Sequence, residues 1–355
     1  MMHHERDSSA MSDTRCELAI HRGVEFLRRR QLPSGEFETL VGPDPDLVKG
    51  SQPDPSLFAT MHVAISLLEV RHDDAAAMVS RAAGFLRSEM LPGGLWRFWT
   101  ASHPGSPGIP PDTDDTACIS HLLRQLGIPF PDNQAAILGN RSPLGTFYTW
   151  ILPRTRHLLH PRAWHLFRRS ANARKAVMIF FRSGQEPPDP YGVDAVVNAN
   201  ALLYLGDGPH TKRVSHWLAD VVRQGLAATR DRWYQSEYAL FYALARCHER
   251  GVASLRDLSA VMARRIESSE PVKLPSLECA LAACALSILA PASPSLPAFV
   301  ESLLSTQQPD GCWVPRVFYY GGYKRIRAWG SAELTTGFCL EALARYRRAQ
   351  SRSAS

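Results

Sequence analysis

Apolar residues recur every three to four positions along most of this chain, and segments in which apolar and polar residues alternate are nearly absent. This spacing predicts α-helices throughout. Six segments are apolar nearly all round, which is typical of buried helices. They are PSLFATMHVAISLLEV, DDTACISHLLRQLG, VDAVVNANALLYLG, SEYALFYALARCHERG, SLECALAACALSILA and SAELTTGFCLEALARY. More amphipathic segments lie between them, so buried and half-buried helices are expected to alternate.

This alternation predicts an all-α fold, an (α/α)6 toroid in which an inner ring lines a central cavity and an outer ring faces water. An open helical solenoid uses the same alternation and is the alternative. The closed toroid is favoured because solenoid repeats are usually shorter and more uniform in length. We expect one toroid domain over residues 16–348, with loose tails at 1–15 and 349–355.

Composition narrows the class of protein. Hydrophobic residues make up 45% of the 355 residues and charged residues 21%, as in an ordinary globular domain. The net charge of +6 is too mild to indicate nucleic-acid binding. The seven cysteines are odd in number and scattered through apolar segments, which is typical of reduced core cysteines. The first residues lack the apolar stretch of a signal peptide, so we expect a cytoplasmic protein.

Three outer helices end in a similar turn: residues 31–37 (QLPSGEF), 90–96 (MLPGGLW) and 307–313 (QQPDGCW). The glycine permits a left-handed end to the helix, and the aromatic residue two positions later can pack back under the last turn. The glutamine can bond to backbone groups of the next repeat. These residues are therefore expected to join the repeats.

The turns occur together with Asp112-Thr113-Asp114-Asp115-Thr116-Ala117 at the start of a buried helix. This combination resembles the class II terpene cyclases of the squalene-hopene cyclase superfamily, which pair QW repeats with a DxDD acid motif on an α/α toroid. The repeats cover roughly residues 16–347. Full-length members have two toroids, and this chain has room for one. It has no DDxxD motif, so metal-dependent ionisation of a diphosphate is not indicated.

The resemblance implies that Asp114 is the acid that protonates the substrate and that Asp112 and Asp115 orient or tune it. Neighbouring carboxyls and burial keep a proton on such a cluster. An alignment of the buried helices places Asp115 opposite other acidic residues, which predicts a helix-capping role for it. Those residues are Asp194, Glu237, Glu278 and Glu333. His121, two turns after Asp114, would relay the proton or be an ordinary core histidine.

Aromatic faces stabilise a carbocation without capturing it. Rings gather in the segments that lead into the buried helices, where they would line the mouth of the toroid or simply pack the loops. The candidates are Trp96, Trp99, Trp233, Tyr234, Tyr319, Tyr320, Tyr323 and Trp329. Asp194, Asn198 and Asn200 lie on a buried helix and are either ligands facing the cavity or members of a buried hydrogen-bond network.

Two basic segments are candidates for anion binding. Lys324, Arg325 and Arg327 lie beside the aromatic residues and would bind a substrate diphosphate. In that case Mg²⁺ would assist, and no other cofactor or metal site is expected. Residues 154–175 join basic and aromatic side chains, a pattern that suits an anionic membrane surface or a prenyl diphosphate head group, or equally the solvated side of an outer helix.

Together these features predict a class II terpene cyclase that cyclises a linear isoprenoid, such as farnesyl or geranylgeranyl diphosphate or a prenylated aromatic. Its partners would be this small molecule and, peripherally, a membrane; an oligomer or a partner domain would cover an open face. One alternative is a non-catalytic toroid that binds a lipid or a protein. Another is a zinc-dependent prenyltransferase-like or lanthionine-cyclase-like enzyme, with zinc ligands among Cys247, His248, Asp310 and Cys312.

Overall fold

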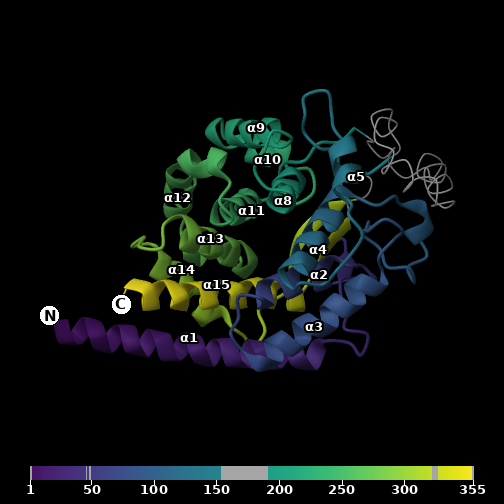
Figure 1. The fold of residues 1–355 in the computed structure, drawn as a ribbon. Helices are drawn as coiled ribbons and strands as arrows, with labels where there is room; N and C mark the ends of the chain where they lie inside the picture. Colours follow the sequence, from purple (N-terminus) through teal and green to yellow (C-terminus); the bar gives the residue numbers. More distant parts are fainter. Residues whose placement is uncertain (1, 45, 48, 153–190, 322–326, 354–355) are drawn as a thin grey trace.

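The computed structural model describes residues 2–44, 46–47, 49–152, 191–321 and 327–353. Within these ranges, six helices form an inner ring (Figure 1). They are α2 (Phe58–Leu67), α4 (Thr113–Gln125), α8 (Ala195–Leu205), α11 (Glu237–Glu249), α13 (Ser276–Leu289) and α15 (Ala332–Ser353). Each of them contains one of the six apolar segments, so the prediction of the buried helices is confirmed.

The inner ring is closed. Each inner helix packs against the next one along the chain, and α15 packs against α2, so that the last helix meets the first. Every residue of α2 is buried, as are nearly all residues of α4 and α8, because ring neighbours and outer helices cover them on several sides. The toroid prediction is therefore confirmed, and the open solenoid is excluded.

An outer layer of helices surrounds the ring (Figure 1). Its long members are α1 (Met2–Arg30), α3 (Asp73–Ser88), α9 (Lys212–Arg223), α12 (Ser259–Glu267) and α14 (Leu296–Thr306). Shorter pieces are α5 (Gln134–Gly139), α10 (Ala227–Arg230) and the 3-10 turns η1 (Ser106–Gly108), η3 (Ala253–Leu258) and η4 (Pro271–Lys273). Helix α9 shows the amphipathic pattern, since Val214, Leu218 and Val222 are buried on one face.

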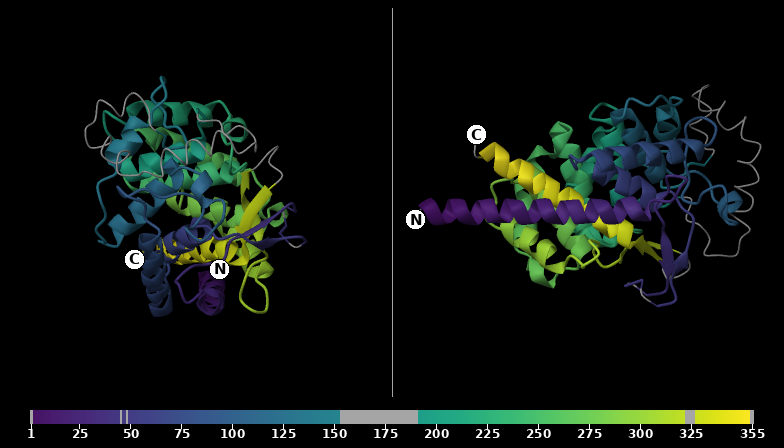
Figure 2. Two further views of the ribbon diagram at one scale, coloured as in Figure 1. Left: turned by 90° about the vertical axis from the view of Figure 1, so that its right-hand side faces the viewer. Right: turned by 90° about the horizontal axis from the view of Figure 1, so that it is seen from below.

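Both ends of the chain are more helical than we expected. Helix α1 begins at Met2, where we expected a loose tail, and α15 continues to Ser353, beyond residue 348. The two helices lie side by side (Figure 2). An ion pair of 2.6 Å joins Asp13 to Arg347, and Arg15 pairs with Glu301 of α14 at 2.8 Å. These contacts hold α1 against the toroid.

A small antiparallel sheet, which the sequence analysis did not predict, accompanies the helices. Its strands β1 (Leu40–Gly42), β2 (Gln52–Pro53), β3 (Arg316–Gly321) and β4 (Arg327–Ser331) stand in the order β2-β1-β4-β3. The strands are too short for a clear alternation, and β1 pairs with β4 from the far end of the chain. Since β4 leads directly into α15, the sheet lies at the N-terminal end of the inner ring.

The repeated turns join neighbouring repeats as expected. The Gln31 side chain donates hydrogen bonds of 2.9 Å to the carbonyls of Gly35, in its own turn, and Met78, in α3. Gln307 makes the equivalent two bonds, also of 2.9 Å, within its turn and to α1. Each glutamine thereby ties the end of one outer helix to the next outer helix around the ring.

The aromatic residues of the turns pack back as expected. The indole N–H of Trp96 donates to the Leu86 carbonyl in the last turns of α3 (2.7 Å), and that of Trp313 donates to Leu303 of α14 (2.8 Å). Gly311 has a φ of +96°, and a Cβ atom there would lie 2.3 Å from a backbone oxygen of α1. Only glycine fits that position.

No helix among the described residues is long and apolar enough to cross a membrane.

We predict that Gln31→Ala lowers the free energy of unfolding by about 1–3 kcal/mol, because two buried carbonyls lose their donor. Urea unfolding followed by circular dichroism measures the change. Gln308→Ala is the control, since its side chain donates only to the nearby Thr306 carbonyl near the surface. That variant should stay within about 0.5 kcal/mol of the wild type. Equal losses in the two variants would contradict a joining role for Gln31.

Candidate active site

Asp112 is the N-cap of the inner helix α4. Its backbone is extended, and its carboxylate accepts a 2.8 Å hydrogen bond from the backbone N–H of Asp115. Asp194 caps α8 in the same way, accepting from Val197 at 2.9 Å. Asp194 therefore corresponds to Asp112. Our alignment of Asp194 with Asp115 was wrong by three residues, because the apolar pattern alone did not show where each helix begins.

A second set of hydrogen bonds fixes the register of three repeats. In each, the backbone N–H of the turn aromatic donates to a threonine of the next inner helix. The pairs are Phe37–Thr60 (2.8 Å), Trp96–Thr116 (3.1 Å) and Trp313–Thr336 (3.1 Å). Counting back two residues from each threonine places Phe58 and Leu334 opposite Asp114. Two other repeats thus have an apolar side chain where Asp114 stands, so packing does not require a carboxylate there.

Asp115 does not have the capping role that we expected. It supplies the backbone N–H that the cap binds, and the threonine register makes Thr335, rather than Glu333, its counterpart in α15. Glu237 is the first residue of α11 and is also out of register. Of the expected counterparts, only Glu278, the third residue of α13, occupies the same place in its helix.

Asp114 carries a buried carboxyl that contacts two other elements of the fold. Its side chain is held between α8 and the segment before α11, and the residue is only 7% exposed. Asn200 of α8 donates to Oδ1 at 2.8 Å, and the Tyr234 hydroxyl donates to Oδ2. Burial raises the pKa of Asp114, while the hydrogen bonds from Tyr234 and Asn200 oppose that rise. The site therefore favours a protonated acid but also supplies two neutral donors for its conjugate base.

The two flanking carboxyls share this environment. Burial, with the charge of Asp115 next in importance, raises the pKa of Asp112 well above its usual value. Burial and the charge of Asp114 raise the pKa of Asp115 to about 7. One oxygen of each flanking carboxyl has no hydrogen-bond partner within the described part of the chain. Three adjacent buried acids cannot all ionise cheaply, so the cluster keeps protons at neutral pH.

Aromatic rings pack around the N-terminal end of the inner ring, next to Asp114. Tyr319 of β3 lies at the centre of this group and contacts five other rings. They are Phe98 and Trp233, which stack on it with centroids at 5.2 and 5.4 Å, Phe58 and Trp329, at 5.3 and 5.4 Å, and Tyr234, edge-on at 6.2 Å. Phe318 meets the Tyr234 ring edge-on at 4.9 Å. We call these seven residues the aromatic cluster.

Asp54, which the sequence analysis missed, anchors the cluster. Its Oδ2 accepts the indole N–H groups of Trp99 (2.9 Å) and Trp329 (2.7 Å), and its Oδ1 lies 3.0 Å from His103 Nε2. The His103 ring in turn stacks on Trp99 at 4.3 Å. These bonds tie the loop before α2 to β4, and fix the orientation of both indoles. Asp54 stands between two prolines in the sequence, and nothing local distinguishes it from a turn residue.

Solved structures share this architecture. The type II terpene cyclase MstE from Scytonema aligns with a TM-score of 0.61 at 16% identity, over 95% of this chain and 99% of that one. An MstE variant in complex with geranylgeranyl dihydroxybenzoate aligns at 0.64 and 14%, over 96% and 99%. The ent-copalyl diphosphate synthase from Streptomyces platensis aligns at 0.54 and 20%, over 82% of this chain and 50% of that one. The sequence matches no protein-family model and no curated protein. The chain has the fold of class II terpene cyclases.

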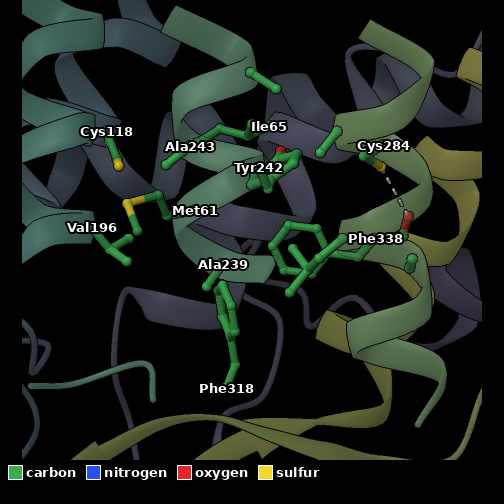
Figure 3. Close-up of a cluster of buried hydrophobic side chains, with 14 of the residues drawn as sticks. Met61, Ile65, Cys118, Val196, Ala239, Tyr242, Ala243, Cys284, Phe318 and Phe338 are labelled. Atoms are coloured by element: carbon green, nitrogen blue, oxygen red, sulfur yellow. Dashed lines mark hydrogen bonds between the residues drawn. The ribbon is translucent and has the colours of Figure 1, made fainter. Parts of the chain in front are cut away.

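In this class II cyclase fold the centre of the inner ring is filled by side chains from several inner helices and from β3 (Figure 3). They are Met61, Ile65, Cys118, Val196, Ala239, Tyr242, Ala243, Cys284, Phe318 and Phe338. All are buried, and most are small or flexible apolar groups. We call this region the lumen. Cys118 is one turn after Asp114 on α4, which places the acid at the N-terminal end of the lumen.

His62, a second buried group that sequence reasoning missed, lies beside the lumen. Its ring is 4.8 Å from Phe58, 5.1 Å from Phe318 and 5.6 Å from Phe338. Both ring nitrogens lack a hydrogen-bond partner among the described residues. Burial lowers the pKa of His62 to about 3, so the ring is neutral and adds no competing positive charge.

Two of the expected substrate-contacting rings lie elsewhere. Trp96 is fully buried beneath α3, where its indole serves the turn, so it is a structural residue. Tyr320 follows Tyr319 on β3 and therefore points to the other face, where it packs against Leu47 and its neighbours. Trp99, Trp233, Tyr234, Tyr319 and Trp329 do lie in or against the aromatic cluster.

Asp194 and Asn198 form a buried network and do not face the lumen. Asp194 caps α8 and also accepts from the backbone N–H of Trp233 at 3.3 Å. Asn198 bonds both the N–H (2.7 Å) and the carbonyl (2.9 Å) of Phe147. Of the two open alternatives, the structure therefore supports the hydrogen-bond network. Asn200, two residues later, is the side chain of this helix that reaches the acid.

Part of the predicted anion site lies outside the described residues: Tyr323, Lys324, Arg325 and the basic stretch 154–175. Arg327 is described. It is the first residue of β4, a central strand of the sheet, and is exposed to solvent.

His121 lies at the opposite end of the lumen from the acid. It is seven residues after Asp114, about 10 Å along α4. There it lines a cavity of about 250 Å³ among the C-terminal ends of the inner helices. Burial and the charges of nearby arginines lower its pKa to about 3. It makes no hydrogen bond to Asp114, and so the direct proton relay that we considered is not supported.

No three His, Cys, Asp or Glu side chains within the described ranges are grouped so that they could hold a metal ion. Cys247, a candidate zinc ligand, is buried, and its Sγ donates to the Ala199 carbonyl at 3.2 Å. Burial raises the pKa of its thiol to about 12, whereas a zinc ligand must be a thiolate. A buried, protonated thiol does not fit a zinc site, and no reaction step below involves a metal.

We predict that Asp112→Ala lowers the free energy of unfolding by about 0.5–2 kcal/mol, as the loss of an N-cap does. Asp112→Asn keeps an oxygen that accepts from the same backbone N–H and should lose much less. Thermal and urea unfolding of the two variants, side by side, measure the difference. If alanine and asparagine cost the same, the cap is not what Asp112 contributes to stability.

Proposed function

We propose that this protein is a class II terpene cyclase, which protonates a linear isoprenoid and cyclises the resulting carbocation. One observation carries the proposal: a buried carboxyl that the repeat does not require, Asp114, lies at the end of an apolar lumen beside a cluster of aromatic rings. The fold shared with MstE and with ent-copalyl diphosphate synthase supports it.

Asp114 is the acid in this proposal. Its proton passes to the terminal alkene or epoxide of the substrate; for an alkene, the π electrons form the new C–H bond and leave a carbocation. The conjugate base keeps its two hydrogen bonds, from Asn200 and from the Tyr234 hydroxyl. Because both donors are neutral, they stabilise the carboxylate without the full charge that would make Asp114 ionise before the substrate binds. Asp112 and Asp115 flank the acid, and the charge of Asp231 also raises the pKa of Asp114.

The surroundings suit the carbocation that follows. Rings of the aromatic cluster offer their faces to a positive charge, an interaction worth about 0.5–2 kcal/mol per ring. The described lumen residues are mainly aliphatic, aromatic or thiol side chains, and the cysteines are protonated because burial raises their pKa well above the usual value. Successive attack by alkene π electrons closes the rings, and loss of a proton from carbon ends the reaction.

The substrate is a linear isoprenoid that fits a single toroid. A variant of MstE has been solved with geranylgeranyl dihydroxybenzoate, a prenylated aromatic, and the other neighbour is named for a prenyl diphosphate product. Both substrate types that the sequence suggested therefore have a precedent on this fold. Met61, Ala239 and Ala243 are small or flexible enough to yield to a prenyl chain in the lumen.

We predict that Asp114→Asn reduces turnover by at least about 10³-fold, since an amide cannot protonate an alkene. The melting temperature should be unchanged or higher, because a buried acid is costly to keep. Mass spectrometry of products from farnesyl and geranylgeranyl diphosphate, squalene and geranylgeranyl dihydroxybenzoate measures turnover. Asp220→Asn, an exposed acid of the outer helix α9, is the matched control.

Two outcomes would contradict the proposal. Full activity in Asp114→Asn would remove Asp114 from the chemistry. No product from any substrate with wild-type protein, together with tight binding of the same compounds, would favour the non-catalytic lipid-binding alternative.

The Tyr234 hydroxyl lowers the pKa of Asp114, so Tyr234→Phe should raise it. Activity requires protonated Asp114 and falls as pH rises through that pKa. The variant should therefore lose activity at a higher pH than the wild type, and its maximal rate should be roughly tenfold lower because the acid is weaker. The pH profile of kcat tests both effects. If the rate is lower but activity is lost at the same pH as in the wild type, Tyr234 only shapes the cavity.

A further inference from the structure

The lumen has a second polar end, which the proposed reaction does not use. It is the cavity of about 250 Å³ that His121 lines, at the C-terminal ends of α2, α4, α8 and α11 and beside the middle of α15. Three arginines and three glutamates lie on its wall: Arg246, Arg250, Arg345, Glu69, Glu249 and Glu341. A charged pocket at one end of the apolar lumen suits a ligand that is apolar along most of its length and polar at one end.

The glutamates of this cavity are already engaged. Arg345 is only 5% exposed and pairs with Glu341 at 2.8 Å, Glu249 at 2.9 Å and Glu69 at 3.0 Å. Glu341 also accepts the Tyr242 hydroxyl at 2.8 Å. One arginine therefore pairs with three carboxylates, and none of the three forms an ion pair with Arg246 or Arg250 among the described residues.

Arg246 is the group that this arrangement leaves unpaired. It is 7% exposed, lines the cavity, and makes neither a hydrogen bond nor an ion pair through its side chain with any residue that the structure describes. Its guanidinium lies 5.4 Å from the centroid of the Tyr242 ring. Burying a guanidinium without a paired anion costs folding free energy. Such a group is kept where a bound ligand supplies the anion.

Neutral polar groups face Arg246 across the cavity. His121 and, one turn later, Gln125 come from α4, while Arg246 and, one turn later, Arg250 come from α11. The Nδ1 atom of His121 has no hydrogen-bond partner within the described ranges. Leu203 of α8 also lines the cavity. A planar guanidinium fork that shares a cavity with two neutral hydrogen-bonding groups suits one small planar anion.

We propose that this cavity binds the head group of the isoprenoid and that the head group is a carboxylate. The inference rests on the proposed function for the isoprenoid chain, and it assigns the end of the substrate remote from the alkene that Asp114 protonates. The equal numbers of arginines and glutamates argue for a singly charged anion, because a diphosphate would add several negative charges beside three glutamates. The exposed Arg327 at the other end of the lumen then has no part in head-group recognition.

The test compares farnesoic acid, farnesol and farnesyl diphosphate, which share one prenyl chain and differ in head group. Binding is measured by isothermal titration calorimetry in the Asp114→Asn background, so that turnover does not consume the ligand. In that background we expect farnesoic acid to bind most tightly. Adding Arg246→Gln should weaken farnesoic acid about 10- to 100-fold, the usual worth of a charge-assisted hydrogen bond, and leave farnesol unchanged.

Gln125→Glu provides a second variant at an exposed position that should not affect folding. It places a negative charge at the cavity and should also weaken farnesoic acid selectively. Arg223→Gln, on the outer helix α9, is the control for loss of a positive charge. Tighter binding of farnesyl diphosphate than of farnesoic acid, or an equal effect of Arg246→Gln and Gln125→Glu on acid and alcohol, would overturn the proposal.

The two proposals fail in different ways. If wild-type protein forms no cyclic product but farnesoic acid binds in an Arg246-dependent manner, the cyclase function is wrong and the carboxylate site stands. If Asp114-dependent cyclisation is observed and the acid-to-alcohol preference does not change in Arg246→Gln, only the head-group assignment is wrong.

Discussion

Packing of α15 against α2 turns a chain of helical repeats into a ring, and the position of each functional group depends on that contact. In an open solenoid, one face of each inner helix would meet water. In the ring, those faces meet one another and form the lumen, so a side chain that points inward loses its hydration. The energetic cost of every polar group inside, from Asp114 to Arg246, follows from closure.

The polar groups inside the ring fall into two kinds, according to how the free-energy cost of their burial is offset. Some are fully satisfied by protein partners, as Asp194 and Asn198 are, and these serve the fold. Others keep an unmet requirement. Asp114 has its hydrogen bonds but stands where two other repeats have apolar side chains, and the Arg246 side chain makes no ion pair with a described residue. Both proposals here rest on groups of the second kind, because their burial is not explained by stability.

The parallel arrangement of the inner helices separates these groups. Helix N-termini gather at one end of the lumen, with the sheet and the aromatic cluster, and helix C-termini gather at the other end, with the arginines and glutamates. The acid and the unpaired guanidinium are thus held at opposite ends of one apolar space. A rigid scaffold of this kind can bind a long substrate in one orientation, which directs a single alkene toward the acid.

The sequence alone determined the helical repeat, the identity of the inner helices, the joining turns and the acid motif, because periodicity and turn chemistry are local properties of the chain. It did not determine the helix starts, so Asp115 was taken for the cap instead of Asp112. Asp54, His62 and Arg246 were overlooked, the contact of Asn200 with the acid was not foreseen, and Trp96 was misplaced. The role of each depends on partners contributed by distant helices or loops. Only tertiary structure brings such groups together, because closing the ring places side chains from six separate helices around one buried space.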